Sequence, residues 1–493
     1  MTKITITLRI VMIASLFGIT TASAQYSQEA KIVSENRESR AEYGTSVAIR
    51  NSYALAGAAR ENNASGAAYI YHKDSGGNWT FQQSITAPDP NEGAEYGGGA
   101  KMVDSLMVIA AGRADVSGLQ RTGALYVYQL NETTWEYQTK LIANDFSADA
   151  KMGMNPTSLA MENATIVAGA PGENGWVGSV YVFEKSGGTW SQEQKIMSPN
   201  PQPNDTFGIG VAIAGDFMVV GANEEDNTKG AAHIYRKSNV GVWDHIQKIT
   251  ASDAMAQGYF GTSVAITDSY IAIGAYGHAG GEGSTYIFEN DGTNNWTETQ
   301  KITASSPSIE ANFGWNCILQ NEYLIVSAPH PYGSEKGEVY VYKNSAGVFN
   351  EIQKVESLDL APEDFYGWNI EMDGNQLIVG APWEDEDATG GNTVDRAGSA
   401  YIFKDPALAI NDFHDTTSLL VYPIPTKKNI TITSNNSINK ITLLNELGAL
   451  LLESNPKAIQ EYNLDLSQYA KGLYFLNVET TNGQTTIKKV IVE

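Results

Sequence analysis

An aromatic residue or methionine followed by glycine recurs along the 493-residue chain, and this repetition constrains the fold more than any other feature. The seven pairs are Tyr43-Gly44, Tyr96-Gly97, Met152-Gly153, Phe207-Gly208, Phe260-Gly261, Phe313-Gly314 and Tyr366-Gly367. Successive glycines are 53 to 56 residues apart. A period of this length is typical of solenoids and propellers, in which each repeat forms one supersecondary unit.

Each repeat contains four short apolar segments with turn residues between them. The first follows the glycine, the second ends in small residues as at 378–382, the third starts at a glycine as at 178–183, and the fourth follows Trp or Phe as at 247–249. Segments rich in Val, Ile and Tyr and bounded by Gly, Asn or Asp predict strands. Four strands in each of seven repeats predict an all-β, seven-bladed β-propeller over residues 25–405.

The seventh repeat stops at residues 403–405 without a fourth strand. Residues 29–33 near the N-terminus match the Gln-Lys-Ile pattern that marks this strand in other repeats. We therefore expect the N-terminal strand to complete the last blade and close the ring, which an open solenoid would not need.

Residues 1–24 have the features of a secretory signal peptide. A basic start with Lys3 and Arg9 leads into an apolar run at 10–19, and small residues at 22–24 precede Gln25. The run is too short to span a bilayer, and no later segment is long and apolar enough to do so. We expect an exported mature chain that begins near Gln25 and has no transmembrane segment.

The charge is strongly acidic, with 32 Lys and Arg against 56 Asp and Glu, a net charge of −24. Nucleic acid is therefore not an expected partner, because phosphate binding needs clustered bases. The single cysteine, Cys317, excludes an internal disulfide and a cysteine-based zinc site.

In a propeller, the loops between second and third strands and between blades share one face, and these loops carry 27 acidic and 9 basic residues. The negative electrostatic field of these loops attracts cations or basic protein surfaces. The alternative is that the charges only keep the face solvated.

The Phe-Gly openings and Gly-Ala-Pro endings over residues 29–405 resemble FG-GAP repeats, which form integrin α-subunit propellers and occur in many bacterial surface proteins. Integrin-type repeats often carry a calcium loop between the first two strands. Here that connection is a tight turn, as at 214–217 and 267–270, with too few acids for the six to eight oxygens that calcium prefers. We expect no cofactor. The acid clusters at 224–226 and 384–387 leave calcium possible, but their spacing matches no ligand motif.

A linker is predicted at 406–418, and alternating strands follow over 419–493. The marked positions are Tyr422, Pro423, Pro425, Gly448, Gly472, Tyr474, Lys488 and Lys489. This pattern resembles the type A C-terminal sorting domain of the type IX secretion system of Bacteroidota, although Ile424 replaces the Asn usual in its Tyr-Pro-Asn-Pro opening. The resemblance implies a small β-sandwich that directs export through the type IX machinery to the cell surface or the medium. An ordinary immunoglobulin-like accessory domain is the alternative.

Four tryptophans are the candidate ligand-binding residues. Trp176 and Trp383 lie in loops between second and third strands, as do Tyr276 and Tyr332, whereas Trp315 and Trp368 directly follow the aromatic-Gly pairs of repeats six and seven. Adjacent blades would bring these last two to one sector of the channel mouth. Flat aromatic faces at a wet rim suit sugar stacking, and packing between blades is the alternative interpretation.

No catalytic motif stands out. The six histidines form no His-x-x-x-His pair, and the chain has neither a Gly-x-Ser-x-Gly elbow nor a phosphate-binding loop. We therefore expect a binding or adhesion protein that recognises a polysaccharide, a protein or a cell surface, and no enzyme. The alternatives are a polysaccharide lyase or glycosidase with its site on the acidic face, and a structural component of a surface layer.

Overall fold

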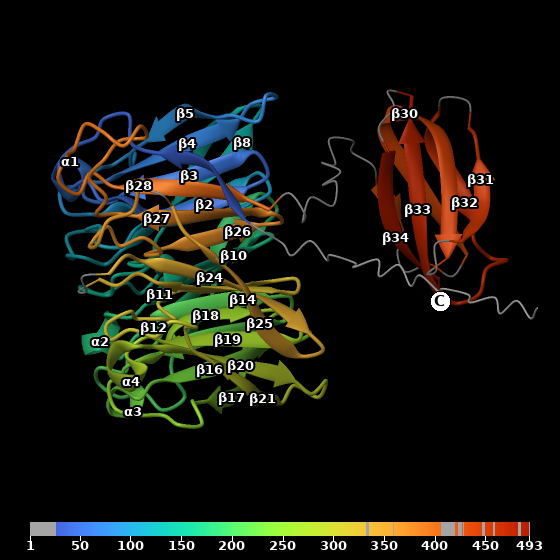
Figure 1. The fold of residues 1–493 in the computed structure, drawn as a ribbon. Helices are drawn as coiled ribbons and strands as arrows, with labels where there is room; N and C mark the ends of the chain where they lie inside the picture. The colour runs from blue at the N-terminus through green and yellow to red at the C-terminus, as the bar shows by residue number, and fades with distance from the viewer. Residues whose placement is uncertain are drawn as a thin grey trace, which may run out of the picture. The chain divides into compact units, whose positions relative to one another are not determined.

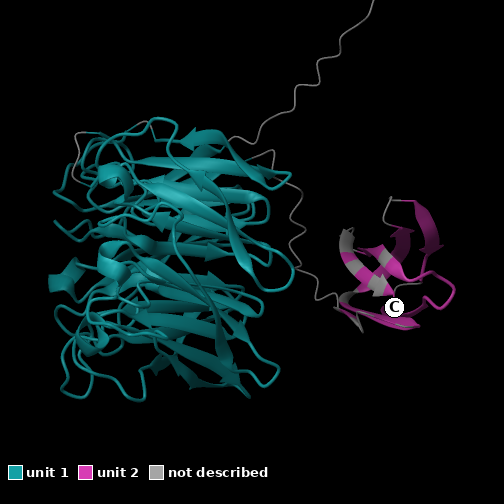
Figure 2. Cartoon of the chain, turned by 90° about the horizontal axis from the view of Figure 1, so that it is seen from below, with its two compact units in different colours: residues 1–408 teal, residues 409–493 magenta. Residues whose placement is uncertain are grey.

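The computed structural model describes residues 26–331, 335–357, 359–405, 420–422, 426, 428–445, 449–456, 459–481 and 485–492. The chain divides into two compact units, residues 1–408 and 409–493 (Figure 2). Several predicted features lie outside the described residues: the signal peptide at 1–24, the linker at 406–418, Tyr332, Pro423, Ile424, Pro425 and Gly448.

The described part of the first unit is built from seven four-stranded antiparallel sheets, which confirms the all-β, propeller-type fold (Figure 1). In chain order the sheets are β2 (Tyr43–Arg50), β3 (Tyr53–Ala58), β4 (Ala67–Lys73) and β5 (Trp79–Ile85); β6 (Tyr96–Val103), β7 (Leu106–Ala111), β8 (Ala124–Asn131) and β9 (Thr134–Leu141); β10 (Leu159–Glu162), β11 (Thr165–Ala170), β12 (Ser179–Ser186) and β13 (Thr189–Ile196); β14 (Gly210–Ala214), β15 (Phe217–Ala222), β16 (Ala231–Lys237) and β17 (Trp243–Ile249); β18 (Phe260–Ile266), β19 (Tyr270–Ala275), β20 (Ser284–Asn290) and β21 (Trp296–Ile302); β22 (Cys317–Gln320), β23 (Tyr323–Ala328), β24 (Glu338–Ser345) and β25 (Val348–Val355); β26 (Ile370–Asp373), β27 (Gln376–Ala381) and β28 (Ser399–Lys404), with β1 (Ser27–Ile32).

The N-terminal strand completes the last sheet, as the sequence predicts. β1 pairs antiparallel with β28, so that Ser27 lies opposite Lys404 and Ile32 opposite Ala400. The last sheet in turn packs against the first, where β2 contacts β26 and β27 and the Val47 amide donates to Asn369 Oδ1 over 2.7 Å. The first strands of all seven sheets line one central channel.

The turns between first and second strands are as short as predicted. Ala214 pairs with Phe217 and Gln320 pairs with Tyr323, so each of these turns contains two residues. A turn of this length provides too few oxygen atoms to surround a calcium ion.

Glycines allow the backbones of neighbouring sheets to touch. Gly208 has φ +94°, and a Cβ atom added to Gly169 in the preceding sheet would lie 1.8 Å from the Gly208 carbonyl oxygen. The glycine of the repeat opening and the glycine near the end of the second strand are therefore two sides of one contact. This contact explains why both motifs recur with the same period.

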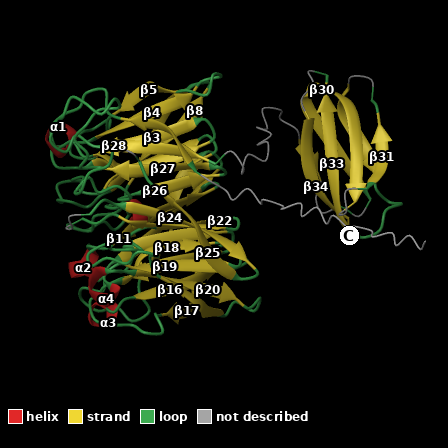
Figure 3. Ribbon diagram, viewed as in Figure 1, coloured by secondary structure: helices red, strands yellow, loops and turns green. Residues whose placement is uncertain are grey.

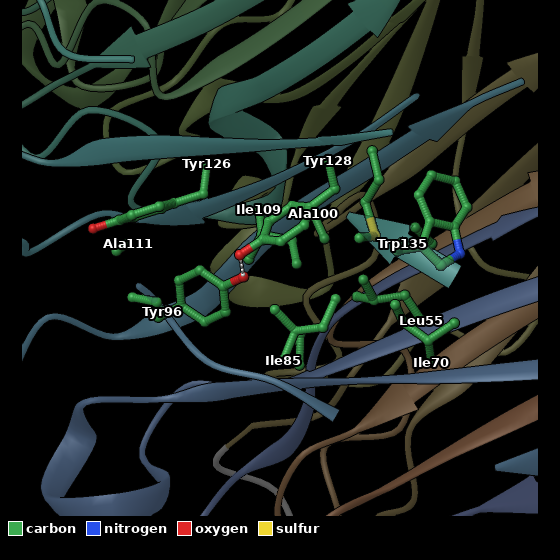
Figure 4. Packing of buried hydrophobic residues seen from close by; sticks show 14 of the residues in the cluster. Leu55, Ile70, Ile85, Tyr96, Ala100, Ile109, Ala111, Tyr126, Tyr128 and Trp135 are labelled. Carbon is green, nitrogen blue, oxygen red and sulfur yellow. Dashed lines mark hydrogen bonds between the residues drawn. The ribbon is translucent and has the colours of Figure 1, made fainter. Parts of the chain in front are cut away.

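The hydrophobic core lies between neighbouring sheets. Leu55 and Ile70 of the first sheet pack against Ile109 and Trp135 of the second (Figure 4). Burial of these apolar side chains is the main favourable contribution to folding. Because each sheet packs against the next, the sheets stabilise one another.

Short helical segments follow four of the second strands and lie at the same end of the sheets (Figure 3). They are α1 (Glu61–Ala64), α2 (Glu173–Trp176), α3 (Glu225–Thr228) and α4 (His278–Gly281), and a 3-10 turn, η1 (Pro156–Ser158), precedes β10. We call this end, formed by the loops between second and third strands and between sheets, the loop face. Since β28 starts there at Ser399, its last residue, Lys404, lies at the opposite end.

The described residues of the second unit form six strands. They are β29 (Leu420–Tyr422), β30 (Asn429–Asn445), β31 (Leu450–Ser454), β32 (Ile459–Asp465), β33 (Gly472–Thr480) and β34 (Thr485–Val492). The first half of β30 pairs with β29 and β32, and its second half pairs with β31 and β33. Side chains from both halves, including Ile430 and Leu443, share one core. This arrangement agrees with the small β-sandwich expected from the sequence.

The predicted sorting residues that the structure describes lie on three strands of this unit. Tyr422 ends β29, Gly472 and Tyr474 lie in β33, and Lys488 and Lys489 lie in β34. The Tyr474 hydroxyl donates a hydrogen bond to the Ala470 carbonyl oxygen over 2.7 Å. Among the described residues of the whole chain, no helix has the length and apolar character needed to cross a membrane.

Candidate functional site

Six aromatic side chains from the fifth, sixth and seventh sheets form one continuous group on the loop face, which we call the aromatic array. Its members in order of contact are Tyr259, Tyr276, Trp315, Trp368, Phe365 and Trp383. The ring centroids of Trp315 and Trp368 are 4.8 Å apart, and those of Phe365 and Trp383 are 4.0 Å apart. The Arg396 guanidinium lies 3.5 Å from the centre of the Trp383 ring and caps the array.

The repeated strand order explains why four of these rings lie at the same end of the sheets. Trp315 and Trp368 directly follow the glycines that open the sixth and seventh repeats. Tyr276 and Trp383 follow the ends of β19 and β27. Because antiparallel strands start and end alternately at one face, all four positions meet around the channel mouth. The predicted proximity of Trp315 and Trp368 is confirmed, and Phe365 connects Trp383 to them.

Tyr259 and Phe365 belong to the array, although the sequence reasoning did not single them out. Each immediately precedes an aromatic-Gly pair and has a positive φ, 54° for Tyr259 and 58° for Phe365. The available signal is the aromatic doublet, Tyr259-Phe260 or Phe365-Tyr366, at the start of a repeat.

Trp176, the fourth predicted tryptophan, lies elsewhere on the loop face. It ends α2 in the third sheet, and the ammonium group of Lys151 lies 4.0 Å from the centre of its ring. The structure therefore joins three of the four predicted tryptophans and leaves Trp176 outside the array.

The array borders a cavity of about 230 Å³ at the channel mouth. Tyr276, Trp315 and Trp368 form one side of it. The remaining lining residues are Asn155, Pro156, Thr157, Ile209, Asn223, Thr262 and Asn316. Flat rings on one side and amide and hydroxyl groups on the other suit a ligand that has both apolar CH surfaces and hydroxyl groups.

Hydrogen bonds hold most of the polar side in place. Thr206 Oγ1 donates to Asn223 Oδ1 over 2.6 Å, and Asn223 Nδ2 donates to Thr262 Oγ1 over 2.9 Å. Thr157 Oγ1 donates to the Ile209 carbonyl oxygen over 3.0 Å. These bonds link the third, fourth and fifth sheets and preorganise this side of the cavity.

The two acid clusters contribute buried carboxylates to interactions within the sheets. Glu225 accepts hydrogen bonds from His233 and Lys248. Burial opposes ionisation of Glu225, but these two hydrogen bonds outweigh it and lower its pKa. Within the described ranges, no group of three or more His, Cys, Asp or Glu side chains is placed to hold a metal ion.

Glu384 in the other cluster is fully buried. It pairs with Lys31 over 2.8 Å and accepts a hydrogen bond from the Tyr401 hydroxyl. Burial, reinforced by a hydrogen bond with Glu386, raises the pKa of Glu384 to about 7. Glu384 thus links β1 to β28 within the seventh sheet.

Two family models match the chain. The FG-GAP repeat matches residues 26–71, 190–235, 243–288, 296–342 and 349–403, and the secretion system C-terminal sorting domain matches residues 420–493. No curated protein matches significantly. Similar solved structures include the crystal structure of a protein from Lactobacillus plantarum, with 12% identity and a TM-score of 0.47, covering 71% of this chain and 99% of that one.

Proposed function

Because the chain carries FG-GAP repeats followed by a secretion system C-terminal sorting domain, which directs it through type IX secretion to the cell surface or the medium, we propose that its first unit is a recognition module for an extracellular polysaccharide. The sorting domain engages the secretion machinery. The propeller then presents the loop face to its ligand.

The main observation that supports this proposal is the cavity at the channel mouth. Tyr276, Trp315 and Trp368 are only half-buried, so they keep apolar surface in contact with solvent. Tryptophan and tyrosine combine a large apolar ring with a polar group, and they dominate binding energy where they occur at recognition sites. Sugar rings present CH faces that stack on such side chains and hydroxyl groups that bond to amides.

The test is direct titration of the purified full-length protein against immobilised polysaccharides. We expect saturable binding to one polysaccharide class without release of shorter products. Trp315→Ala and Trp368→Ala should each weaken binding at least tenfold, as expected for central aromatic anchors. Tyr137→Ala is the matched control, because Tyr137 is 44% exposed on the outer strand β9 of the second sheet.

Three results contradict the proposal. Unchanged affinity of both tryptophan variants, at unchanged melting temperature, removes the array as the site. Release of oligosaccharides would instead support a lyase or glycosidase. Self-association without any polysaccharide binding would support a structural role in a surface layer.

A further inference from the structure

Asn316 combines a largely buried side chain with an amide that stays accessible from the cavity. It is 7% exposed and lines the cavity next to Trp315. Its backbone is engaged, since its N–H donates to Ser327 Oγ over 3.2 Å and its carbonyl oxygen accepts from the Ser327 N–H over 3.0 Å. Within the part of the chain that the structure describes, its side-chain amide makes no hydrogen bond. An amide that faces a cavity without a partner in the protein is available to donate to and accept from a ligand hydroxyl.

The same position is satisfied in other repeats. Ser46 Oγ donates to the Gly97 carbonyl oxygen over 2.6 Å, and Ser263 Oγ donates to the Gly314 carbonyl oxygen over 2.8 Å. Asn369 Oδ1 accepts from the Val47 N–H over 2.7 Å. In these three repeats the side chain bridges two sheets, whereas Asn316 makes no such bridge among the described residues.

The surroundings of Asn316 restrict the charge of the ligand. Among the residues that the structure describes, no charged side chain lines the cavity, while the loops of the loop face carry 27 acidic and 9 basic residues in sequence. An anionic sugar would lose its hydration in the cavity without gaining a cation, and the surrounding carboxylates would repel it. Arg396 is occupied by the ring of Trp383 at the far end of the array.

The size of the cavity restricts the length of the bound segment. Its volume of about 230 Å³ lies below the ~300–1,000 Å³ typical of pockets that enclose a whole drug-sized ligand. One sugar ring fits such a space better than several linked rings. A chain end fills such a space with one ring and leaves the neighbouring units in solvent.

We propose that Asn316 determines the specificity of the site, and that the cavity takes the uncharged terminal sugar of a neutral polysaccharide, one hydroxyl of which bonds to the Asn316 amide. This inference rests on the proposed function and names the ligand class of the same site. The tryptophans supply stacking, and Asn316 supplies the bond that distinguishes one sugar from another.

The test compares Asn316→Leu with Asn369→Leu in the full-length protein. Leucine has a similar size but no amide. In Asn316→Leu we expect an equal or higher melting temperature, because the substitution removes no hydrogen bond within the described residues, together with a threefold to tenfold loss of affinity. In Asn369→Leu we expect a lower melting temperature, because the Val47 N–H loses its acceptor. A purely structural role for Asn316 predicts a fall in melting temperature in both variants.

The probes are neutral gluco-, xylo- and manno-oligosaccharides, tethered at the reducing end, and oligogalacturonides of equal length. We expect binding to one neutral series, competition by the methyl glycoside of its terminal sugar, and no binding to the acidic series. Trp315-dependent binding that is insensitive to Asn316→Leu, or that prefers oligogalacturonides, overturns this inference but keeps the proposed function. Absence of binding to every polysaccharide and oligosaccharide overturns both.

Discussion

Tyr69 lies opposite Ser84 across strands β4 and β5, at the position where the other six sheets pair a tyrosine or histidine with a lysine. Those pairs are Tyr126–Lys140, Tyr181–Lys195, His233–Lys248, Tyr286–Lys301, Tyr340–Lys354 and Tyr401–Lys31. Each of the six lysines forms an ion pair with a carboxylate at the loop face. In the first sheet Tyr69 donates to Glu61, which is 3% exposed, and Ser84 offers no charge. Burial raises the pKa of Glu61.

Replacing this serine by lysine should therefore stabilise the protein. In Ser84→Lys the new ammonium group reaches the buried Glu61 carboxylate, as Lys195 reaches Glu173 in the third sheet over 2.7 Å. We expect a gain of about 1 kcal/mol in the free energy of unfolding, measured by chemical denaturation. Ser84→Met, which has length but no charge, should give no gain. If both variants gain equally, the effect comes from apolar contact and the ion-pair explanation fails.

Ring closure by β1 can be tested with a single core substitution. Ile32 is 4% exposed and packs between the seventh and first sheets, among residues that include Val47 and Ile402. Ile32→Ala should lower the free energy of unfolding by about 2–5 kcal/mol, since it removes buried methyl groups and leaves a cavity. Gln28→Ala, at an exposed position of the same strand, should have little effect. Equal stability of the two variants, measured by thermal or chemical unfolding, would show that β1 is dispensable.

The contact between neighbouring sheets predicts a strong effect at Gly169. A Cβ atom there would meet the backbone oxygen of Gly208, so Gly169→Ala must push two sheets apart. We expect a loss of at least about 3 kcal/mol or failure to fold, measured by circular dichroism and thermal unfolding. Gly391→Ala is the control, because the nearest atom to its added Cβ is Thr389 Oγ1 at 3.8 Å. A small effect at Gly169 would contradict the close approach.

Asp364 should make stability depend on pH. Burial, strengthened by the nearby carboxylates of Glu386 and Asp385, raises the pKa of Asp364 to about 6, above the ~3.9 of an unfolded chain. The folded state then holds this proton more tightly, so the contribution is complete below about pH 4 and is lost as the pH rises through about 6.

The matched variant is Asp364→Asn, which keeps an oxygen to accept the hydrogen bond from the Ala361 N–H. Its melting temperature should exceed that of the unaltered protein at pH 8, and the difference should shrink as the pH falls to 4. Melting curves at closely spaced pH values give the answer. A difference that does not vary with pH would mean that Asp364 titrates as it does in the unfolded chain.

Much of the fold follows from repetition in the sequence. Pairing of β1 with β28 could be predicted because residues 29–33 carry a motif that the seventh repeat lacks. Trp315 and Trp368 could be placed together because they occupy equivalent positions in adjacent repeats. In both cases the prediction compares equivalent positions of different repeats, so the structure of one repeat predicts where the residues of the others lie.

The other features of the candidate site depend on local backbone and side-chain geometry that the repeat pattern does not predict. Trp176 and Trp383 both follow a second strand, but Trp383 comes two residues after β27 and Trp176 comes six residues after β11, so only Trp383 stays near the channel. Phe365 and Tyr259 join the array through backbone conformations with positive φ. Whether Asn316 has a partner depends on the side chains opposite it, which only coordinates show.

The pairing of Ser27 with Lys404 also bears on the order in which the strands can pair during folding. The first strand to be synthesised is the last to find its place, because its neighbour is separated from it by the whole propeller. Until then β28 presents an open edge, to which the first strand of another copy can also pair. The β1–β28 pairing that closes the ring of one molecule is therefore also the place where two molecules that fold side by side could exchange strands and become linked.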